Sequence, residues 1–135
     1  MKLIIYTDGA SRGNPGQASY GFTISDNLGK LIYQEGKYIG IATNNVAEYS
    51  AVLAALKWIK ENIKGKTQIE FYADSKLVVE QLSGRYKIKS PHLRLIIEEI
   101  NKLAVSLGSV KFTHIFREKN ILADKLANQA LDSQS

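Results

Sequence analysis

Four carboxylates in this sequence stand where the expected elements begin or end, and together they could hold divalent cations. Asp8 and Asp74 each follow a short run typical of a strand, whereas Glu48 and Asp124 are expected in the first turns of segments with helical spacing. Carboxylate oxygens are the ligands that Mg²⁺ and Mn²⁺ prefer, and the chain has no cysteine to supply thiolate ligands. Two such ions can activate a water molecule and stabilise a leaving oxygen. The acids therefore predict metal-dependent phosphodiester hydrolysis.

Each acid also has a purely structural interpretation. Asp8 could belong only to a turn, and Asn45 and Glu48 have the spacing of a helix N-cap with its reciprocal N3 acid. Asp74 could simply begin a helix, and Asp124 could only complement a helix dipole. A shared position at one end of a sheet is what would favour the metal site over these alternatives.

The elements that must position the acids follow from hydrophobic periodicity. Strands are expected at 2–7, 20–24, 31–39, 68–73 and 110–116, and helices at 43–65, 75–82, 93–107 and 121–131. The order βββαβααβα predicts a mixed five-stranded sheet flanked by helices, with the later strands parallel to the first. Asp8 and Asp74 would then emerge at the same sheet edge. In the last helix, Leu122, Leu126 and Ala130 form the expected apolar stripe.

Composition limits the class of protein. The 135 residues, 44% hydrophobic and 23% charged, predict a single domain over 1–135 and argue against disorder. The lack of cysteine excludes a disulfide scaffold and a cysteine nucleophile, and the net charge of +5 suits a polyanionic partner. No apolar run approaches the ~20 residues of a membrane span, and the first apolar run is too short for a signal peptide. We expect a cytoplasmic monomer without a membrane partner.

Four segments, in order, resemble the motifs of type 1 ribonucleases H, the ribonuclease HI family. They are Tyr6–Gly16 (YTDGASRGNPG), Thr43–Tyr49 (TNNVAEY), Tyr72–Ser75 (YADS) and Arg117–Ala127 (REKNILADKLA). Each segment carries one of the four acids, and the resemblance covers nearly the whole chain, with the same element order.

The resemblance implies an endonuclease that cuts the RNA strand of RNA–DNA hybrids and leaves a 5′-phosphate and a 3′-hydroxyl. It also implies two Mg²⁺ ions, with Mn²⁺ as a substitute, held by Asp8, Glu48, Asp74 and Asp124. Double-stranded RNA is a further candidate substrate because it shares the A-form geometry. By analogy with the family, the candidate hybrid-contacting residues are Ser11, Gly13, Asn14, Thr43, Asn44, Asn45, Ser75 and Lys76.

Two features depart from the usual bacterial pattern. Many relatives have a histidine in a glycine-containing loop before the last acid, and Arg117 occupies that stretch here. A guanidinium cannot act as a base at neutral pH, so its role in catalysis would be electrostatic. His114 is a competing candidate, but it alternates in phase with Phe112 and Phe116 and so is expected on the final strand.

The second departure is the absence of a long basic protrusion between the third and fourth motifs. The segment Gly84–Arg94 offers Arg85, Lys87 and Lys89, which could hold backbone phosphates or form only a solvated loop. Two rival functions remain: a hybrid-binding module that has lost catalysis, and a non-nucleolytic α/β domain with a coincidental acidic cluster. Retention of all four acids argues against the first rival.

Overall fold

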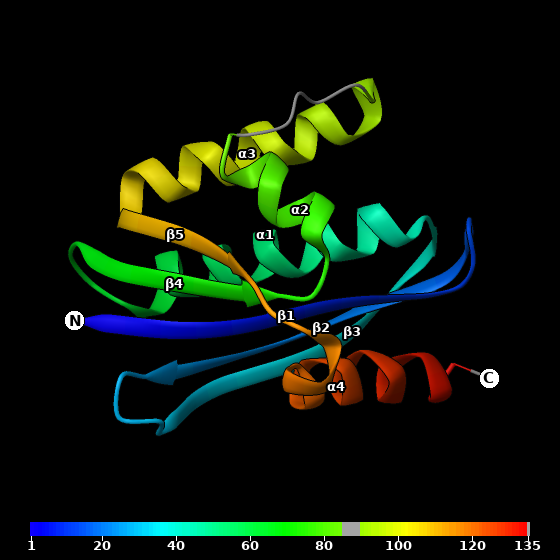
Figure 1. Ribbon diagram of the computed structural model, residues 1–135, viewed down its shortest axis with the longest axis horizontal. Coiled ribbons are helices and arrows are strands. Elements are labelled where there is room, and N and C mark those ends of the chain that lie inside the picture. Colours follow the sequence, from blue (N-terminus) through cyan, green and yellow to red (C-terminus); the bar gives the residue numbers. More distant parts are fainter. Residues whose placement is uncertain (85–89, 135) are drawn as a thin grey trace.

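The computed structural model describes residues 1–84 and 90–134 of the chain. Its elements are β1 (Lys2–Gly13), β2 (Gly16–Asp26), β3 (Leu31–Ala42), α1 (Asn44–Asn62), β4 (Thr67–Ala73), α2 (Lys76–Leu82), α3 (Pro91–Leu107), β5 (Gly108–His114), the 3₁₀ helix η1 (Arg117–Lys119) and α4 (Ile121–Asp132). The predicted order βββαβααβα is confirmed, with η1 as an addition (Figure 1).

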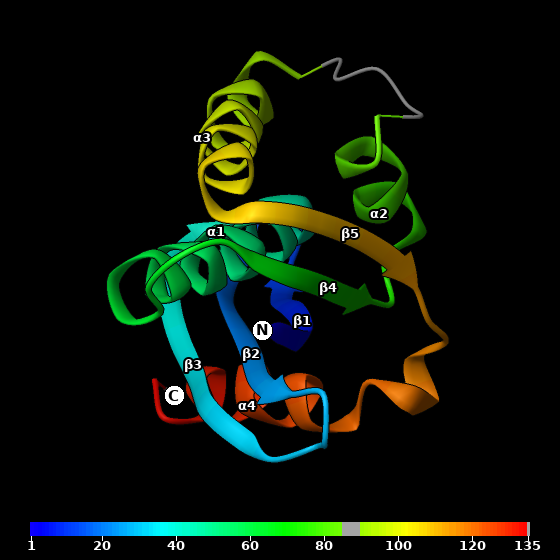
Figure 2. The ribbon, with the colours of Figure 1, turned by 90° about the vertical axis from the view of Figure 1, so that its left-hand side faces the viewer.

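One mixed sheet organises these elements, in the strand order β3-β2-β1-β4-β5. The first three strands form an antiparallel meander, and β4 and β5 run parallel to β1. Helices α1, α2 and α3 cover one face and α4 covers the other, as the two views in Figures 1 and 2 show. The parallel strands therefore end together at one edge, as the right-handed crossover rule predicts.

The core lies between the sheet and α1. Alternate residues of the central strands point into it, and α1 contributes positions spaced by three and four residues. Fully or almost fully buried side chains here are Leu3, Ile5, Phe22, Ile24, Phe71, Val52, Leu56 and Ile59. Burial of each contributes roughly 1.5–3 kcal/mol, so this layer holds the strand ends in fixed relative positions.

Strand β1 is longer than its sequence predicts. The turn-forming residues after Thr7 indicated that the strand would end there, but β1 continues to Gly13 and pairs with β2 throughout. Pairing with a long neighbouring strand overrides the weak strand propensity of Asp, Gly and Ser in this stretch. The parallel partner β4 does end at this level, because its last residue, Ala73, pairs with Thr7. Asp8 thus stands where β1 loses one neighbour, inside a strand rather than at its end.

The apolar stripe predicted for α4 is wrong by one residue. Leu122 is 57% exposed, whereas Ala123, Ala127 and Leu131 are buried. A Cβ atom added to Gly21 of β2 would lie 2.4 Å from the carbonyl oxygen of Ala123. The helix backbone therefore touches the sheet, and only small side chains fit between them.

The other element bounds differ from the sequence expectations only at their ends. The largest difference is at β2, which begins four residues early, at Gly16. Differences of three residues occur where β3 extends to Ala42 and where α1 ends at Asn62. Strand β5 ends at His114, so Phe116 lies beyond the strand on which it was expected, with 69% of its surface exposed. Within the described residues, the helices lack the combination of length and apolarity that crossing a membrane requires.

Candidate metal centre

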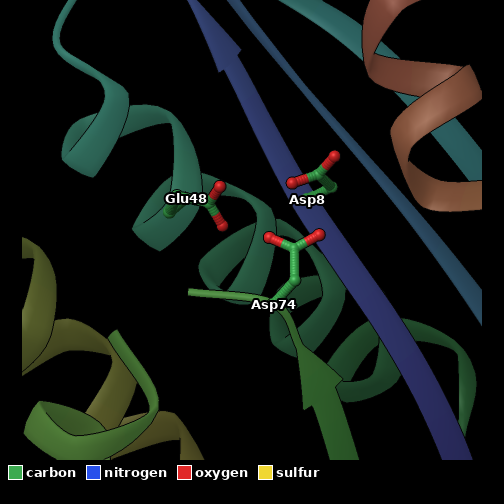
Figure 3. A group of neighbouring side chains, drawn as sticks. All are labelled: Asp8, Glu48 and Asp74. Atoms are coloured by element: carbon green, nitrogen blue, oxygen red, sulfur yellow. The ribbon is translucent and has the colours of Figure 1, made fainter. Parts of the chain in front are cut away.

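Three carboxylates converge at the edge where the parallel strands end. Asp8 comes from β1, Glu48 from α1, and Asp74 directly follows β4. One ligand oxygen from each lies within 4.8 Å of the other two. Figure 3 shows the three side chains pointing toward one another across a common space. Asp8 is 5% exposed and Glu48 9%, so two of the three carboxylates are largely removed from water.

The fourth predicted acid joins the same site. Asp124 lies in the first turn of α4, close enough to Asp8 that its side chain helps to raise the pKa of Asp8. Together with Glu48, Asp74 and Arg117, these two residues line a pocket of about 430 Å³. The structure thus brings all four acids, from distant parts of the sequence, to one hollow.

Two glycines allow the helices to approach Asp8 so closely. A Cβ atom on Gly9 would lie 2.5 Å from the backbone nitrogen of Glu48, so a larger residue would push α1 away from β1. Gly21 lies opposite Asp8 in the β1–β2 register and accepts the close packing of α4. Both glycines are within strands, where they permit close backbone approach rather than a turn.

Glu48 does not take part in a helix cap. Thr43 is the N-cap of α1, and its Oγ1 accepts a hydrogen bond from the backbone N–H of Val46 at 3.2 Å. The interpretation of Asn45 and Glu48 as a capping box is therefore wrong, and Glu48 lies beyond the first helical turn. Its carboxylate is free to face the acids, and one of its oxygens lies within 4.8 Å of ligand oxygens of Asp8 and Asp74.

The electrostatics of the cluster favour a bound proton or cation. Burial raises the pKa of Asp8 far above its usual value, and the negative charges of Glu48 and Asp74 raise it further. The pKa of Glu48 is also raised, first by burial and then by the charge of Asp74. Two carboxylates ~5 Å apart repel by about 3 kcal/mol at an effective dielectric near 20. Within the described part of the chain, Glu48 Oε2 is buried without a hydrogen-bond partner. An all-oxygen donor set of this kind fits a hard divalent cation.

Asn120 is a site residue that the sequence analysis did not single out. Its Nδ2 donates to the carbonyl oxygen of Thr7 at 2.8 Å and to Asp74 Oδ2 at 3.1 Å. An asparagine at a helix start is ordinarily interpreted as a cap, so the single sequence carries no signal for this contact. Asn128 was also missed, although its contact with Asp124 at 3.2 Å follows from their spacing of four residues on one helix.

The asparagines predicted to contact substrate tie the end of the β1–β2 hairpin to the start of α1. Asn14 Oδ1 accepts a hydrogen bond from the backbone N–H of Asn44 at 3.0 Å. Ser11 Oγ donates to the carbonyl oxygen of Ala42 at 3.2 Å. Of these residues, Ser11 and Asn44 also line the acidic pocket. Structural and substrate-binding roles are therefore compatible here.

The remaining candidates have simple positions. Gly13 ends β1 with a φ of +113°, a value that favours glycine, and Asn45 lies in the first turn of α1. Ser75 caps α2 by accepting from the backbone N–H of Val78 at 3.3 Å, and Lys76 is the first residue of that helix.

Arg117 and His114 differ in their relation to the pocket. Arg117 lies on η1 and lines the pocket. His114 is the last residue of β5, as its alternation predicted, and its ring contacts Phe116 at a centroid distance of 5.9 Å. His114 is not one of the described residues that line the pocket. Arg85, Lys87 and Lys89 lie outside the described residues.

Comparison with known proteins places the chain in a family. A family described as reverse-transcriptase-like matches residues 6–130. A bifunctional protein of Mycobacterium tuberculosis is 42% identical over 135 residues, which cover 98% of this chain and 36% of that protein. A ribonuclease HI of Halobacterium salinarum is 42% identical over 127 residues, 94% of this chain and 63% of that enzyme. The chain therefore spans between about a third and two-thirds of the length of these relatives.

The structural similarity extends over nearly the whole fold. The crystal structure of LC11-RNase H1 in complex with RNA/DNA hybrid superposes with a TM-score of 0.93 and 40% sequence identity, and the match covers 98% of each chain. Sequence motifs, strand order and overall geometry agree, and the chain belongs to the ribonuclease HI family of reverse-transcriptase-like domains.

Proposed function

We propose that this protein is a metal-dependent endoribonuclease that hydrolyses the RNA strand of RNA–DNA hybrids. The observation that carries the proposal is the convergence of Asp8, Glu48 and Asp74 within 4.8 Å, with Asp124 in the same pocket. The similarity to a ribonuclease H1 solved in complex with RNA/DNA hybrid supports the choice of substrate. Hydrolysis would leave a 5′-phosphate and a 3′-hydroxyl.

The four acids are the proposed ligands of two Mg²⁺ ions, for which Mn²⁺ could substitute. When bound, the ions would supply an activated water molecule and stabilise the leaving oxygen. The pKa values of Asp8 and Glu48 are raised first by burial and then by neighbouring negative charge, and a bound cation would favour their ionised forms and relieve the repulsion between them. Asp74 and Asp124, which are more exposed, would complete the ligand set from the open side of the pocket.

Substrate recognition is assigned to the residues that surround the acids. In an A-like hybrid the shallow minor groove displays the 2′-hydroxyls of the RNA strand. Amide and hydroxyl groups suit these contacts because they donate and accept hydrogen bonds. The proposed contacts are made by Ser11, Gly13, Asn14, Thr43, Asn44, Asn45, Ser75 and Lys76.

Positive charge near the pocket has two proposed roles. Arg117, which lines the pocket, would stabilise the phosphate or the leaving group electrostatically. Arg85, Lys87 and Lys89 would bind backbone phosphates, which makes hybrid affinity sensitive to salt. With so short a basic segment, we expect weaker hybrid binding than in relatives that carry a longer protrusion.

One assay tests the proposal. Purified protein is incubated with end-labelled hybrid, duplex RNA and duplex DNA, each with Mg²⁺, Mn²⁺ or a chelator. We expect internal cleavage of the RNA in the hybrid with either ion, 5′-phosphate ends, and no cleavage with chelator. The duplex RNA lane shows whether the activity extends to that substrate. Tight hybrid binding without cleavage under any metal condition would instead indicate a binding module.

A further inference from the structure

We propose that Asn120 is a positioning residue that sets the geometry of the metal ligands, an inference that rests on the proposed function of the acidic cluster. The residue is 1% exposed and lies directly before α4. Its single amide nitrogen donates to the Thr7 carbonyl oxygen at 2.8 Å and to Asp74 Oδ2 at 3.1 Å.

These contacts join three segments that carry acids. Thr7 immediately precedes Asp8 in β1, and Asp74 follows β4. The carbonyl oxygen of Asn120 also accepts the backbone N–H of Asp124, at 3.3 Å. One buried residue therefore links the backbone beside Asp8, the side chain of Asp74 and the helical turn of Asp124.

The side chain of Asn120 does not serve its own helix. Asparagine before a helix usually caps it by accepting a backbone N–H, but α4 has no such side-chain bond, and Asn120 has φ −114° and ψ 44°. Within the described residues, its Oδ1 is also buried without a partner. Both of its observed acceptors require a donor, which fixes the amide orientation. Asn120 thus breaks the usual local preference of asparagine for helix capping, and it contacts a site residue instead. Departures of this kind are expected at functional positions.

Asp74 is the metal ligand whose orientation depends most on Asn120. This acid is half-buried and lies beyond the last paired residue of β4, so neighbouring strands do not restrain its carboxylate. A hydrogen bond to Oδ2 restricts rotation of the carboxylate and sets the direction of both oxygens. Hydrogen bonds of this kind, which orient metal ligands from behind, typically change metal affinity or activity by 10- to 100-fold when removed.

The test compares Asn120→Ala with the wild-type chain. Calorimetric titration with Mn²⁺ should give an affinity about 10- to 100-fold weaker for the variant. In cleavage assays the Mg²⁺ concentration for half-maximal rate should rise by a similar factor, while KM for hybrid at saturating Mg²⁺ stays near the wild-type value. The second readout separates ligand positioning from substrate binding.

Ser19→Ala is the matched control. Ser19 is fully buried and donates its hydroxyl hydrogen to the carbonyl oxygen of Ala127, so it also links the sheet to α4 but touches none of the acids. It should lower stability without changing Mn²⁺ affinity. If Asn120→Ala fails to fold, Asn120→Ser takes its place, because its short hydroxyl cannot replace both amide contacts.

The outcomes are distinct. Unchanged Mn²⁺ affinity in a folded Asn120 variant overturns the inference, and so does an equal loss of affinity in Ser19→Ala. A wild-type protein that binds Mn²⁺ but cuts no hybrid would overturn the proposed function, and the calorimetric comparison would still decide the role of Asn120.

Discussion

The acids of this protein lie in two contrasting environments, one with hydrogen-bond donors or a cation and one with other acids nearby. Within the edge strand β3, Glu35 accepts hydrogen bonds from the hydroxyls of Tyr20 and Tyr33, both at 2.7 Å. Glu70 accepts from Tyr72 and forms an ion pair with Lys2 at 2.7 Å. These acids have the donors that partly buried carboxylates normally need.

The carboxyl ends of the strands are different. Within the described residues, none of the four clustered acids forms an ion pair with a lysine or arginine. The pKa of Glu70 is lowered by its hydrogen bond with Lys2, whereas the pKa values of Asp8 and Glu48 are raised by burial and mutual repulsion. The fold supplies a cationic partner for Glu70 but, within the described residues, none for the four clustered acids, which is the arrangement expected of a site that receives its positive charge from a cation.

The largest expected effect comes from removing a clustered charge. Asp74→Asn should lower kcat by about a thousandfold or more, because a cation site supplies several kcal/mol of transition-state stabilisation and each 1.36 kcal/mol is tenfold in rate. Single-turnover cleavage of hybrid at saturating Mg²⁺ measures the change. Near-wild-type turnover would mean that Asp74 is not a metal ligand and that the clustered acids do not differ in function from the paired ones.

The next effect is on stability. Without metal, Asp8→Asn should raise the free energy of unfolding by about 1–3 kcal/mol near pH 7, because the native state no longer has to keep this buried carboxyl protonated at a pH where the unfolded chain ionises it. Chemical denaturation in chelator checks this. The gain should disappear in Mg²⁺, where the wild-type carboxylate is a ligand. A variant less stable than wild type in chelator would show that Asp8 has a structural role like that of Glu35.

The two groups of acids should make folding stability change with pH in opposite directions. A carboxyl whose pKa is raised on folding binds its proton more tightly in the native state, so stability falls as pH rises from the unfolded pKa near 4 toward the folded value. Metal-free protein should therefore lose stability from about pH 4 to about pH 7 through Glu48, and on to about pH 10 through Asp8. Glu70, with a lowered pKa, acts in the opposite direction, and its contribution is lost as pH falls. The free energy of unfolding, measured by denaturation at each pH, should change less with pH when Mg²⁺ is present. In chelator, the free energy of unfolding of Asp8→Asn should change less with pH than that of the wild-type protein.

The smallest effect is expected in the paired acids. Glu35→Gln keeps the shape but gives the two tyrosine hydroxyls a poorer acceptor set, which should cost about 0.5–1.5 kcal/mol of stability. Mn²⁺ affinity and cleavage rate should stay at wild-type levels. A large loss of metal binding in this variant would mean that the two regions are coupled.

The strand order and the meeting of the acids at one edge were predictable from sequence, because crossover handedness and element order are enough to place Asp8 and Asp74 together. The extension of β1 past Thr7 was not, since it depends on pairing with β2. The buried face of α4 was also missed, because it depends on Gly21, a hundred residues earlier in the chain.

The N-cap of α1 and the contact of Asn120 show the same difference between local and long-range signals. The capping role of Thr43 had a local signal, a threonine directly before a helical run, and the competing Asn45–Glu48 spacing obscured it. The contact of Asn120 with Asp74 spans 46 residues and has no local signal at all. Contacts between distant segments are what the single sequence leaves undetermined.

The most direct test of the metal centre is a crystal structure of the protein grown with Mn²⁺, with anomalous diffraction used to locate the ions. The account predicts anomalous density between the carboxylates of Asp8, Glu48 and Asp74, with Asp124 at its edge. Ions found only elsewhere on the molecule at saturating Mn²⁺, with these four carboxylates sharing protons among themselves, would contradict it.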